Sequence, residues 1–357
     1  MNIVAHNHQS SEFFSSKISH FLDEFHVGKL LKSCNAYKVR GFSVKTVFQA
    51  AFENAFSSKS FFQKEKEAVP SFPFAKDTLY RFMNSCSVNW RKFTLQLGSA
   101  VIRKVAPLTD ESRRNVLIID DSLFSRSRSK KVELLAKVYD HVEHKYTKGF
   151  RMLTLGWSDG NSFLPLSHCL LSSANRENRL QEASVDVDTR SNGGKQRKLA
   201  QTKATSVVQT LLKEAKDADI PAKYVLFDTW FCSPASLIQT KEIGYDVIAM
   251  LKKSDTIHFR YNGRMQSAPA IFRAATKRRG RARFLLSVDV EAVKGLTSTP
   301  VKLVFVRNRN KRQEYLILAS TDISLSEEEI IQTYGKRWNI EVFFKMCKSF
   351  LKLGKES

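Results

Sequence analysis

Two short apolar runs that end in aspartate restrict the fold of this chain more than any other feature of its sequence. Between Asn115 and Asp120 the chain reads Val-Leu-Ile-Ile, and between Lys223 and Asp228 it reads Tyr-Val-Leu-Phe. Uninterrupted runs of β-branched and large apolar residues are typical of strands that are covered on both faces. The pattern therefore predicts an α/β domain with a buried central sheet. It places acidic residues at the carboxyl edge, where such sheets carry their sites.

Each of these runs, taken alone, also fits a strand that ends in a turn or in a helix cap, because aspartate is favoured at both positions. The repetition of the pattern, together with a third acidic residue at Glu341, favours a shared site. Asp121 follows Asp120 directly. Since the side chains of a strand alternate between its two faces, only one of these two aspartates is expected to point toward the other acidic residues.

A helix is predicted from Thr333 to Phe350, and one of its faces combines an aromatic ring, two cations and a carboxylate. The residues on this face are Tyr334, Arg337, Glu341 and Lys348. At about 100° per residue they project within about 60° of one another. Such a stripe is suited to contacting a phosphate backbone and a metal ion together.

Apolar residues surround this stripe, which indicates that the helix is packed on most sides. A buried carboxylate is costly unless a cation or a metal compensates its charge, so Glu341 is expected to face a cleft that holds one. The alternative is an ion pair within the helix, between Glu341 and either Arg337 or Lys345. The two upstream aspartates favour the first interpretation.

The complete pattern consists of two strand-end aspartates followed by four residues at fixed spacing, namely Asp120, Asp228 and Tyr334-x2-Arg337-x3-Glu341-x6-Lys348. This pattern resembles the DDE transposases of bacterial insertion sequences, in the branch that is named for its Y-R-E-K signature. The resemblance extends roughly from Asn115 to Lys348. It implies a ribonuclease-H-like α/β catalytic domain that cleaves and joins DNA strands at the ends of a mobile element.

The resemblance also implies the catalytic residues. Asp120, Asp228 and Glu341 would be catalytic and would bind two Mg²⁺ ions, with Mn²⁺ as an alternative ion. Carboxylate oxygens suit such hard cations, and two metals can clamp the attacking and leaving oxygens of a phosphoryl displacement. The family pattern, an aspartate followed two positions later by Ser or Thr, is met by Asp120 with Ser122. It favours Asp120 as the first ligand, with Asp121 as the alternative.

DNA contacts are implied by the same resemblance for Tyr334, Arg337 and Lys348, which would grip phosphates near the scissile bond. The alternatives are packing between helices for the tyrosine and solvated charges for the other two. The composition fits a DNA partner, because 58 Lys and Arg against 35 Asp and Glu give a formal net charge of +23. A strongly basic chain attracts polyanions, although charge alone does not separate DNA from RNA or from an anionic membrane.

No apolar run approaches the ~20 residues that a bilayer-spanning helix needs. Residues 1–10 also lack a secretory apolar segment. The chain is therefore expected to be soluble and intracellular and to have no membrane partner. The resemblance implies that it is cytoplasmic in a bacterium and associated with the nucleoid when bound to DNA. Its five cysteines are scattered without CxxC spacing, so they are expected to be buried small residues rather than disulfides or zinc ligands.

The distribution of apolar and basic residues, read together with this resemblance, predicts four segments. Residues 1–110 are expected to form a helical DNA-binding domain, with a plain helical bundle as the alternative. Residues 111–253 are expected to form the first part of the ribonuclease-H-like core, in which 186–203 is predicted to be a mobile basic loop. Residues 254–323 are expected to form a β-rich insertion, and 324–357 the closing catalytic helix with a short C-terminus.

Two basic loops of the predicted insertion, residues 277–283 and 307–312, would suit gripping a DNA end. Charge runs of this kind are more commonly solvated faces, and that interpretation stays open for both loops.

Three functions are compatible with these patterns. The first is a cut-and-paste DNA transposase that acts as a homodimer on the double-stranded terminal inverted repeats of its element and on target DNA. The second is a catalytically impaired, truncated transposase that acts as a DNA-binding regulator. It is suggested because transposases of this branch generally continue well past the signature lysine, whereas this sequence ends nine residues after Lys348. The third is a general nuclease with a ribonuclease-H fold, which would cut without preference for repeats.

Overall fold

A computed structural model describes residues 3–57, 59–66, 72–110, 113–280, 282–308, 311 and 314–354, with side chains described from residue 14 onward. Arg281, Arg309, Asn310 and Arg312 of the predicted basic loops lie outside the described residues, as does the side chain of Phe13 in the predicted helical segment.

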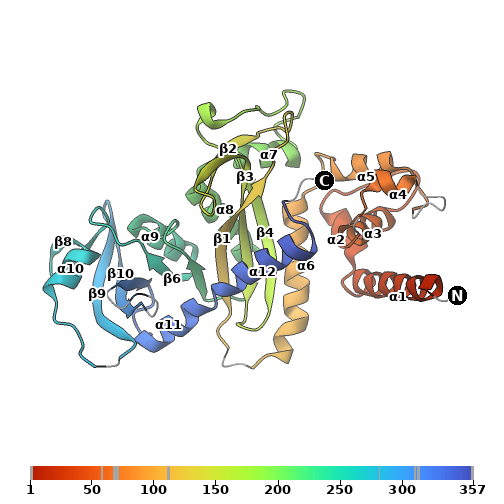
Figure 1. Cartoon of the computed structure of the whole chain (residues 1–357). Coiled ribbons are helices and arrows are strands. Elements are labelled where there is room, and N and C mark those ends of the chain that lie inside the picture. Colours follow the sequence, from red (N-terminus) through yellow and green to blue (C-terminus); the bar gives the residue numbers. More distant parts are fainter. Residues whose placement is uncertain are drawn as a thin grey trace.

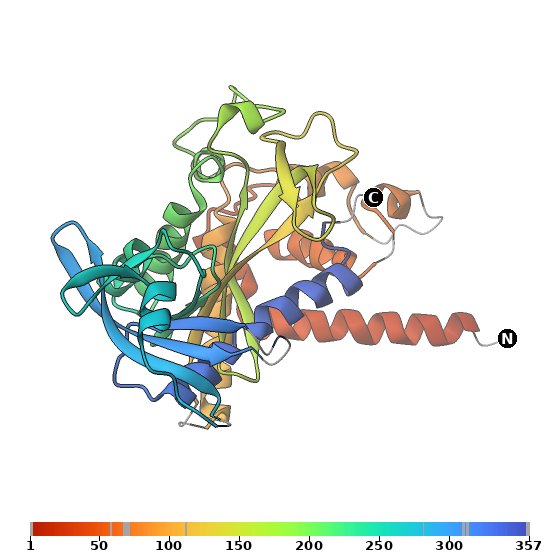
Figure 2. The ribbon, with the colours of Figure 1, turned by 60° about the vertical axis from the view of Figure 1, so that its left-hand side comes forward.

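The N-terminal part of the described chain is helical. Its elements are α1 (Ile3–Glu24), α2 (Val27–Ser33), α3 (Val44–Ala55), α4 (Phe61–Glu65), α5 (Lys76–Met83) and α6 (Trp90–Val105). Ser43 accepts a hydrogen bond from the backbone N–H of Thr46 and so caps α3. The apolar faces of these helices share a core that includes Leu22, Leu31 and Val47. Figure 1 shows this helical part to one side of the sheet, and the turned view in Figure 2 shows α1 projecting away from it.

The long helix α6 connects this helical part to the rest of the molecule. Near its start, Phe93 packs in the N-terminal helical core. Further along, Leu95 and Ile102 are buried in a second core that is centred on the sheet. One helix therefore contributes to two cores.

The described residues form an 11-stranded sheet with strand order β2-β3-β1-β5-β6-β11-β10-β9-β7-β8, and β4 lies beside β3. The strands are β1 (Val116–Ser125), β2 (Ala136–Asp140), β3 (Lys145–Ser158), β4 (Phe163–Leu171), β5 (Tyr224–Phe227), β6 (Asp246–Leu251), β7 (His258–Tyr261), β8 (Arg264–Ser267), β9 (Phe284–Lys294), β10 (Thr297–Arg307) and β11 (Tyr315–Ser320). The strands β1, β5 and β6 are parallel, as expected for strands linked by crossover helices. The other pairings are antiparallel.

The remaining helices are α7 (Asn192–Ala200), α8 (Ala204–Asp217), α9 (Pro234–Ile243), α10 (Ala268–Ala274), α11 (Glu327–Gly335) and α12 (Trp338–Phe350). The sheet carries helices on both faces because the residues of β1 alternate between two cores. Leu117 and Ile119 pack with residues of α6, α8 and α9. Val116 and Ile118 pack with residues of α11 and α12 on the other face. In Figure 1, α12 crosses in front of the sheet.

Two sequence predictions about helices were wrong. The predicted loop over residues 186–203 contains α7, whose first turn is capped by Ser191, which accepts a hydrogen bond from the N–H of Gly194 at 3.0 Å. The predicted single helix from Thr333 to Phe350 is divided into α11 and α12, which are separated at Lys336. The ammonium of Lys336 donates to the backbone oxygens of Arg114 at 2.6 Å and Asp159 at 3.1 Å, which ties this joint to the sheet.

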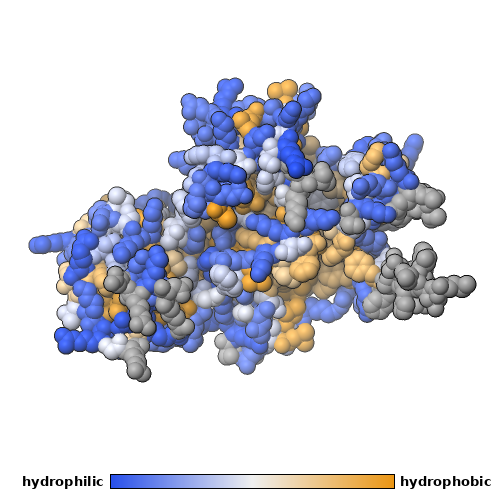
Figure 3. Space-filling view, viewed as in Figure 1, coloured by the Kyte–Doolittle hydropathy of each residue, from blue (hydrophilic) through white to orange (hydrophobic). Residues whose placement is uncertain are grey.

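The segment predicted as a β-rich insertion continues the central sheet. Its strand β11 pairs with β6 from Ile317 opposite Leu251 to Ser320 opposite Ile248. The sheet is therefore hydrogen-bonded from β2 through to β8 without a break. The face of the molecule in Figure 3 is mainly hydrophilic, with apolar residues gathered near its middle. Within the described residues, no helix is both long enough and apolar enough to cross a membrane.

Candidate active site

The two aspartates that follow the apolar runs lie on one face of the sheet. Asp228 directly follows β5 as predicted, but β1 continues past Asp120 to Ser125, so the prediction of a strand end at Asp120 was wrong. In the parallel pair of β1 and β5, Ile118 is opposite Leu226. Continuing this register by two residues places Asp120 opposite Asp228. Both aspartates follow the alternation of residues that pack against α11 and α12, so their side chains face these helices.

Asp120 and Asp121 both lie near Asp228, because the charge of Asp228 acts on Asp120 and the charge of Asp121 acts on Asp228. Asp121 belongs to the set of β1 residues that face the opposite core, where it forms an ion pair with Arg151 of β3. Asp120 instead accepts a hydrogen bond from Nη1 of Arg337 at 3.0 Å. The two adjacent carboxylates therefore have different arginine partners on different faces.

Glu341 of α12 is connected to Asp120 by the same arginine, Arg337. Arg337 directly precedes α12, and its second guanidinium nitrogen, Nη2, is paired with Glu341. Ile340 and Phe344 anchor α12 in the core beneath it. The guanidinium thus lies between the carboxylates of Asp120 and Glu341. Among the described residues, no group of three His, Cys, Asp or Glu side chains is close enough to hold a metal ion.

Burial is the main electrostatic influence at the site. It raises the pKa of Asp120 to about 7, an effect that Arg337 opposes and that the nearby charge of Asp228 reinforces. Burial also raises the pKa of Asp228, while a hydrogen bond of 3.0 Å from the backbone N–H of Trp230 lowers it. Neighbouring carboxylates that are removed from water behave in this way when no nearby cation fully compensates them.

Tyr334 and Lys348 flank the acidic residues at different depths. The ring of Tyr334 on α11 has the guanidinium carbon of Arg337 at 6.0 Å from its centroid. Burial raises the pKa of Tyr334, and its buried hydroxyl has no hydrogen-bond partner among the described residues. Lys348 is exposed on α12, near the turn that joins β2 to β3. There Asp140 has a lowered pKa, mainly because of the backbone N–H of Val142 and to a small extent because of Lys348.

A family model described as "DDE superfamily endonuclease" matches residues 56–310, which is more than two thirds of the chain. The chain belongs to this family. Membership of the DDE superfamily endonucleases indicates a nucleic-acid-cleaving enzyme of the nuclease or transposase type that acts on DNA. The matched region includes Asp120 and Asp228 and ends before Glu341. No curated protein matches the chain.

DDE superfamily endonucleases typically use divalent metals, and the acidic residues of this one fit such ions in their chemistry. Asp120, Asp228 and Glu341 offer only carboxylate oxygens, which hard divalent cations prefer. Burial raises the pKa of Asp120 to about 7, and a divalent cation bound beside it would oppose that effect. For all three carboxylates to share metal ions, Arg337 must move away from its position between Asp120 and Glu341.

Sequence reasoning missed two residues of this DDE endonuclease that contact the site. Arg151 could have been found only through strand pairing, because it lies 30 positions from its partner Asp121. Trp230 follows Asp228 by two residues and donates its backbone N–H to that carboxylate. Its aromatic ring is exposed, which the sequence does not indicate.

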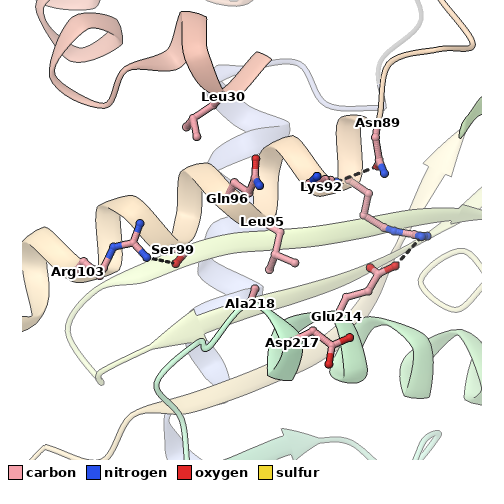
Figure 4. A pocket seen from close by; sticks show the side chains of 11 residues that line it. Leu30, Asn89, Lys92, Leu95, Gln96, Ser99, Arg103, Glu214, Asp217 and Ala218 are labelled. Atoms are coloured by element: carbon pink, nitrogen blue, oxygen red, sulfur yellow. Dashed lines mark hydrogen bonds and ion pairs between the residues drawn. The ribbon is translucent and has the colours of Figure 1, made fainter. Parts of the chain in front are cut away.

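A pocket of about 520 Å³ lies elsewhere, between α6 and α8 (Figure 4). Arg91 and Glu214 form an ion pair of 2.7 Å in its wall, and Arg103 donates to Ser99 at 3.0 Å. Both helices cover the sheet face opposite to α12, and none of the three candidate catalytic carboxylates lines the pocket. It is therefore separate from the candidate active site.

Proposed function

We propose that the protein is a cut-and-paste DNA transposase of the insertion-sequence type, in the Y-R-E-K branch. Asp120, Asp228 and Glu341 are its catalytic residues and metal ligands, and the ions are two Mg²⁺ or Mn²⁺. The observation that carries the proposal is the position of Arg337, which contacts Asp120 of β1 and Glu341 of α12. Asp228, directly after β5, is close enough for its charge to act on Asp120. Family membership supports metal-dependent action on DNA.

The side chains around the acidic residues have distinct tasks in this proposal. The metals would polarise the phosphodiester and activate the attacking hydroxyl or water. Arg337 and Lys348 bind backbone phosphates as cations, and the unpartnered hydroxyl of Tyr334 donates to a phosphate oxygen. The protein acts as a homodimer that brings two element ends together. Once a phosphate takes the guanidinium of Arg337, Asp120 and Glu341 are free to act as ligands.

The test replaces the carboxylate of Glu341 with an amide. Glu341→Gln keeps the shape of the side chain but removes its charge, so Mg²⁺-dependent nicking should fall by at least about 10²-fold while DNA binding persists. The substrate is a plasmid that carries the gene with the DNA on either side of it, and nicks are mapped by primer extension. Glu328→Gln on α11 is the matched control, because Glu328 is exposed and lies on the neighbouring helix.

The positions of the nicks separate the proposed function from its alternatives. Nicks confined to paired inverted repeats support a transposase, whereas nicks spread over the plasmid indicate a general nuclease. Binding to the repeats without nicking by the unaltered protein indicates a DNA-binding regulator. Undiminished nicking by the Glu341→Gln protein contradicts the assignment of the catalytic residues.

A further inference from the structure

Four aromatic rings form a continuous row on the surface next to the candidate active site. Tyr146 and Tyr139 are directly opposite each other on β3 and β2, with ring centroids 5.3 Å apart. The ring centroids of Tyr139 and His141 are 5.0 Å apart, and those of His141 and Trp230 are 5.4 Å apart. We call Tyr146, Tyr139, His141 and Trp230 the aromatic row. It links the β2–β3 hairpin to the loop that follows β5, two segments that are distant in sequence.

The end of the aromatic row is attached to an acidic residue of the site. The backbone N–H of Trp230 donates to Oδ1 of Asp228 at 3.0 Å, so the position of the indole is tied to that carboxylate. The row therefore begins at the acidic residues and leads outward along the hairpin.

The rings of the aromatic row are exposed, which a role in the core does not explain. The exposed fractions are 72% for Tyr146 and 62% for Trp230, and His141 is exposed as well. The contact between His141 and Trp230 is tilted rather than stacked, so no parallel ring covers the exposed indole. Nζ of Lys252 lies 5.9 Å from the ring centroid of Trp230, which adds a cation beside the last ring.

We propose that the aromatic row binds unpaired nucleotides of the DNA substrate by base stacking, with Trp230 as the platform nearest the acidic residues and Lys252 facing the phosphate. Every base has a π face, so aromatic rings next to a cation hold single-stranded DNA with little sequence preference. Bases within a duplex are stacked on each other and cannot lie on these rings. The net charge of +23 favours a polyanion over a protein partner. This inference rests on the proposed function, because it assumes that DNA reaches Asp228.

The test measures stacking directly, in EDTA, so that it does not depend on cleavage. Two duplexes are compared, one fully paired and one with a single unpaired 2-aminopurine, whose fluorescence is quenched when the base stacks. The unaltered protein should bind the second duplex more tightly and quench its fluorescence. Trp230→Ala should reduce that preference by about fivefold or more, the effect of losing one base–ring stack. Trp230→Phe keeps a ring and should retain most of the preference.

Trp338→Ala is the matched control, because Trp338 is 63% exposed and lies outside the aromatic row. It should leave both the preference and the quenching unchanged. Because Trp230 is exposed too, its replacement is expected to leave the fold intact. The inference is overturned if the unaltered protein does not distinguish the two duplexes, or if Trp230→Ala keeps the full preference. Either result leaves the outcome of the Glu341→Gln nicking test unaffected. If Trp230→Ala loses the preference but Glu341→Gln nicks DNA as fast as the unaltered protein, only the proposed function is contradicted.

Discussion

At the scale of single residues, Arg337 explains how the site tolerates its acidic residues. The sequence allowed two interpretations of Glu341, an ion pair within its helix and a part in a shared acidic site. The structure contains the ion pair, in which Arg337 contacts Glu341 four residues along the chain. The same guanidinium also contacts Asp120, at a separation of 217 positions. The local contact could be predicted from helical spacing. The distant one could not, because it depends on how α12 lies across β1.

The buried carboxylate of Asp120 predicts a pH-dependent stability. Its pKa is raised to about 7, so the folded protein favours the protonated form and loses stability as the pH rises from the ordinary aspartate value toward 7. Asp120→Asn removes this cost. In EDTA at about pH 8 the variant should therefore unfold a few degrees higher than the unaltered protein, since about 1 kcal/mol corresponds to roughly 2–4 °C in domains of 150–250 residues. The difference should shrink as the pH falls toward 4.

Thermal unfolding at a series of pH values measures this effect, with Asp289→Asn as the control because Asp289 is exposed on β9. The control should follow the unaltered protein at every pH. A lower midpoint for Asp120→Asn at high pH would mean that the contact with Arg337 outweighs the cost of burial, contrary to the prediction.

At the scale of elements, the apolar runs predicted strands correctly, whereas the glycine-rich stretch led to a wrong prediction of a loop. The runs before Asp120 and Asp228 predicted β1 and β5, because strands that are buried on both faces must be apolar throughout. The stretch that contains Gly193 and Gly194 was predicted to be a loop, yet it opens α7. These glycines instead allow α7 to lie close to neighbouring parts of the chain. A Cβ at Gly194 would lie 2.3 Å from the backbone oxygen of Asp188, a contact that the sequence does not disclose.

This packing predicts a contrast between two helical glycines. Gly194→Ala should lower the free energy of unfolding by about 1–3 kcal/mol, because the new Cβ meets rigid backbone atoms. Gly335→Ala, at the end of α11, meets no atom within 4 Å and should be neutral or stabilising by up to about 1 kcal/mol. Urea unfolding of both variants measures the contrast. Equal stability of the two variants would show that α7 shifts to accommodate the methyl group.

At the scale of the whole molecule, the sheet joins the candidate site to the segment that was predicted as an insertion. Backbone hydrogen bonds pass from β5 to β6 and on to β11 and β10. Alternating short strands and basic loops predicted the β content of this segment. They could not predict its register against β6, because that pairing brings together residues about 70 positions apart.

A continuous sheet predicts that this segment unfolds together with the core. Leu303, Val304 and Phe305 of β10 are fully buried, as are Val225 and Leu226 of β5. Amide hydrogen exchange should therefore give β10 and β5 protection of the same order, set by global unfolding. The exposed turn at Gly295 and Leu296 is the internal reference for fast exchange. Exchange in β10 that is orders of magnitude faster than in β5 would indicate an independently unfolding unit.

The joint at Lys336 gives α12 the geometry of a lever. The ammonium of Lys336 donates to backbone oxygens just before β1 and just after β3, which holds one end of the helix. Lys348, near the other end, is exposed. At 1.5 Å of rise per residue, Glu341 lies about 7.5 Å from this pivot and Lys348 about 18 Å. A tilt of α12 about this pivot would therefore displace Lys348 more than twice as far as Glu341.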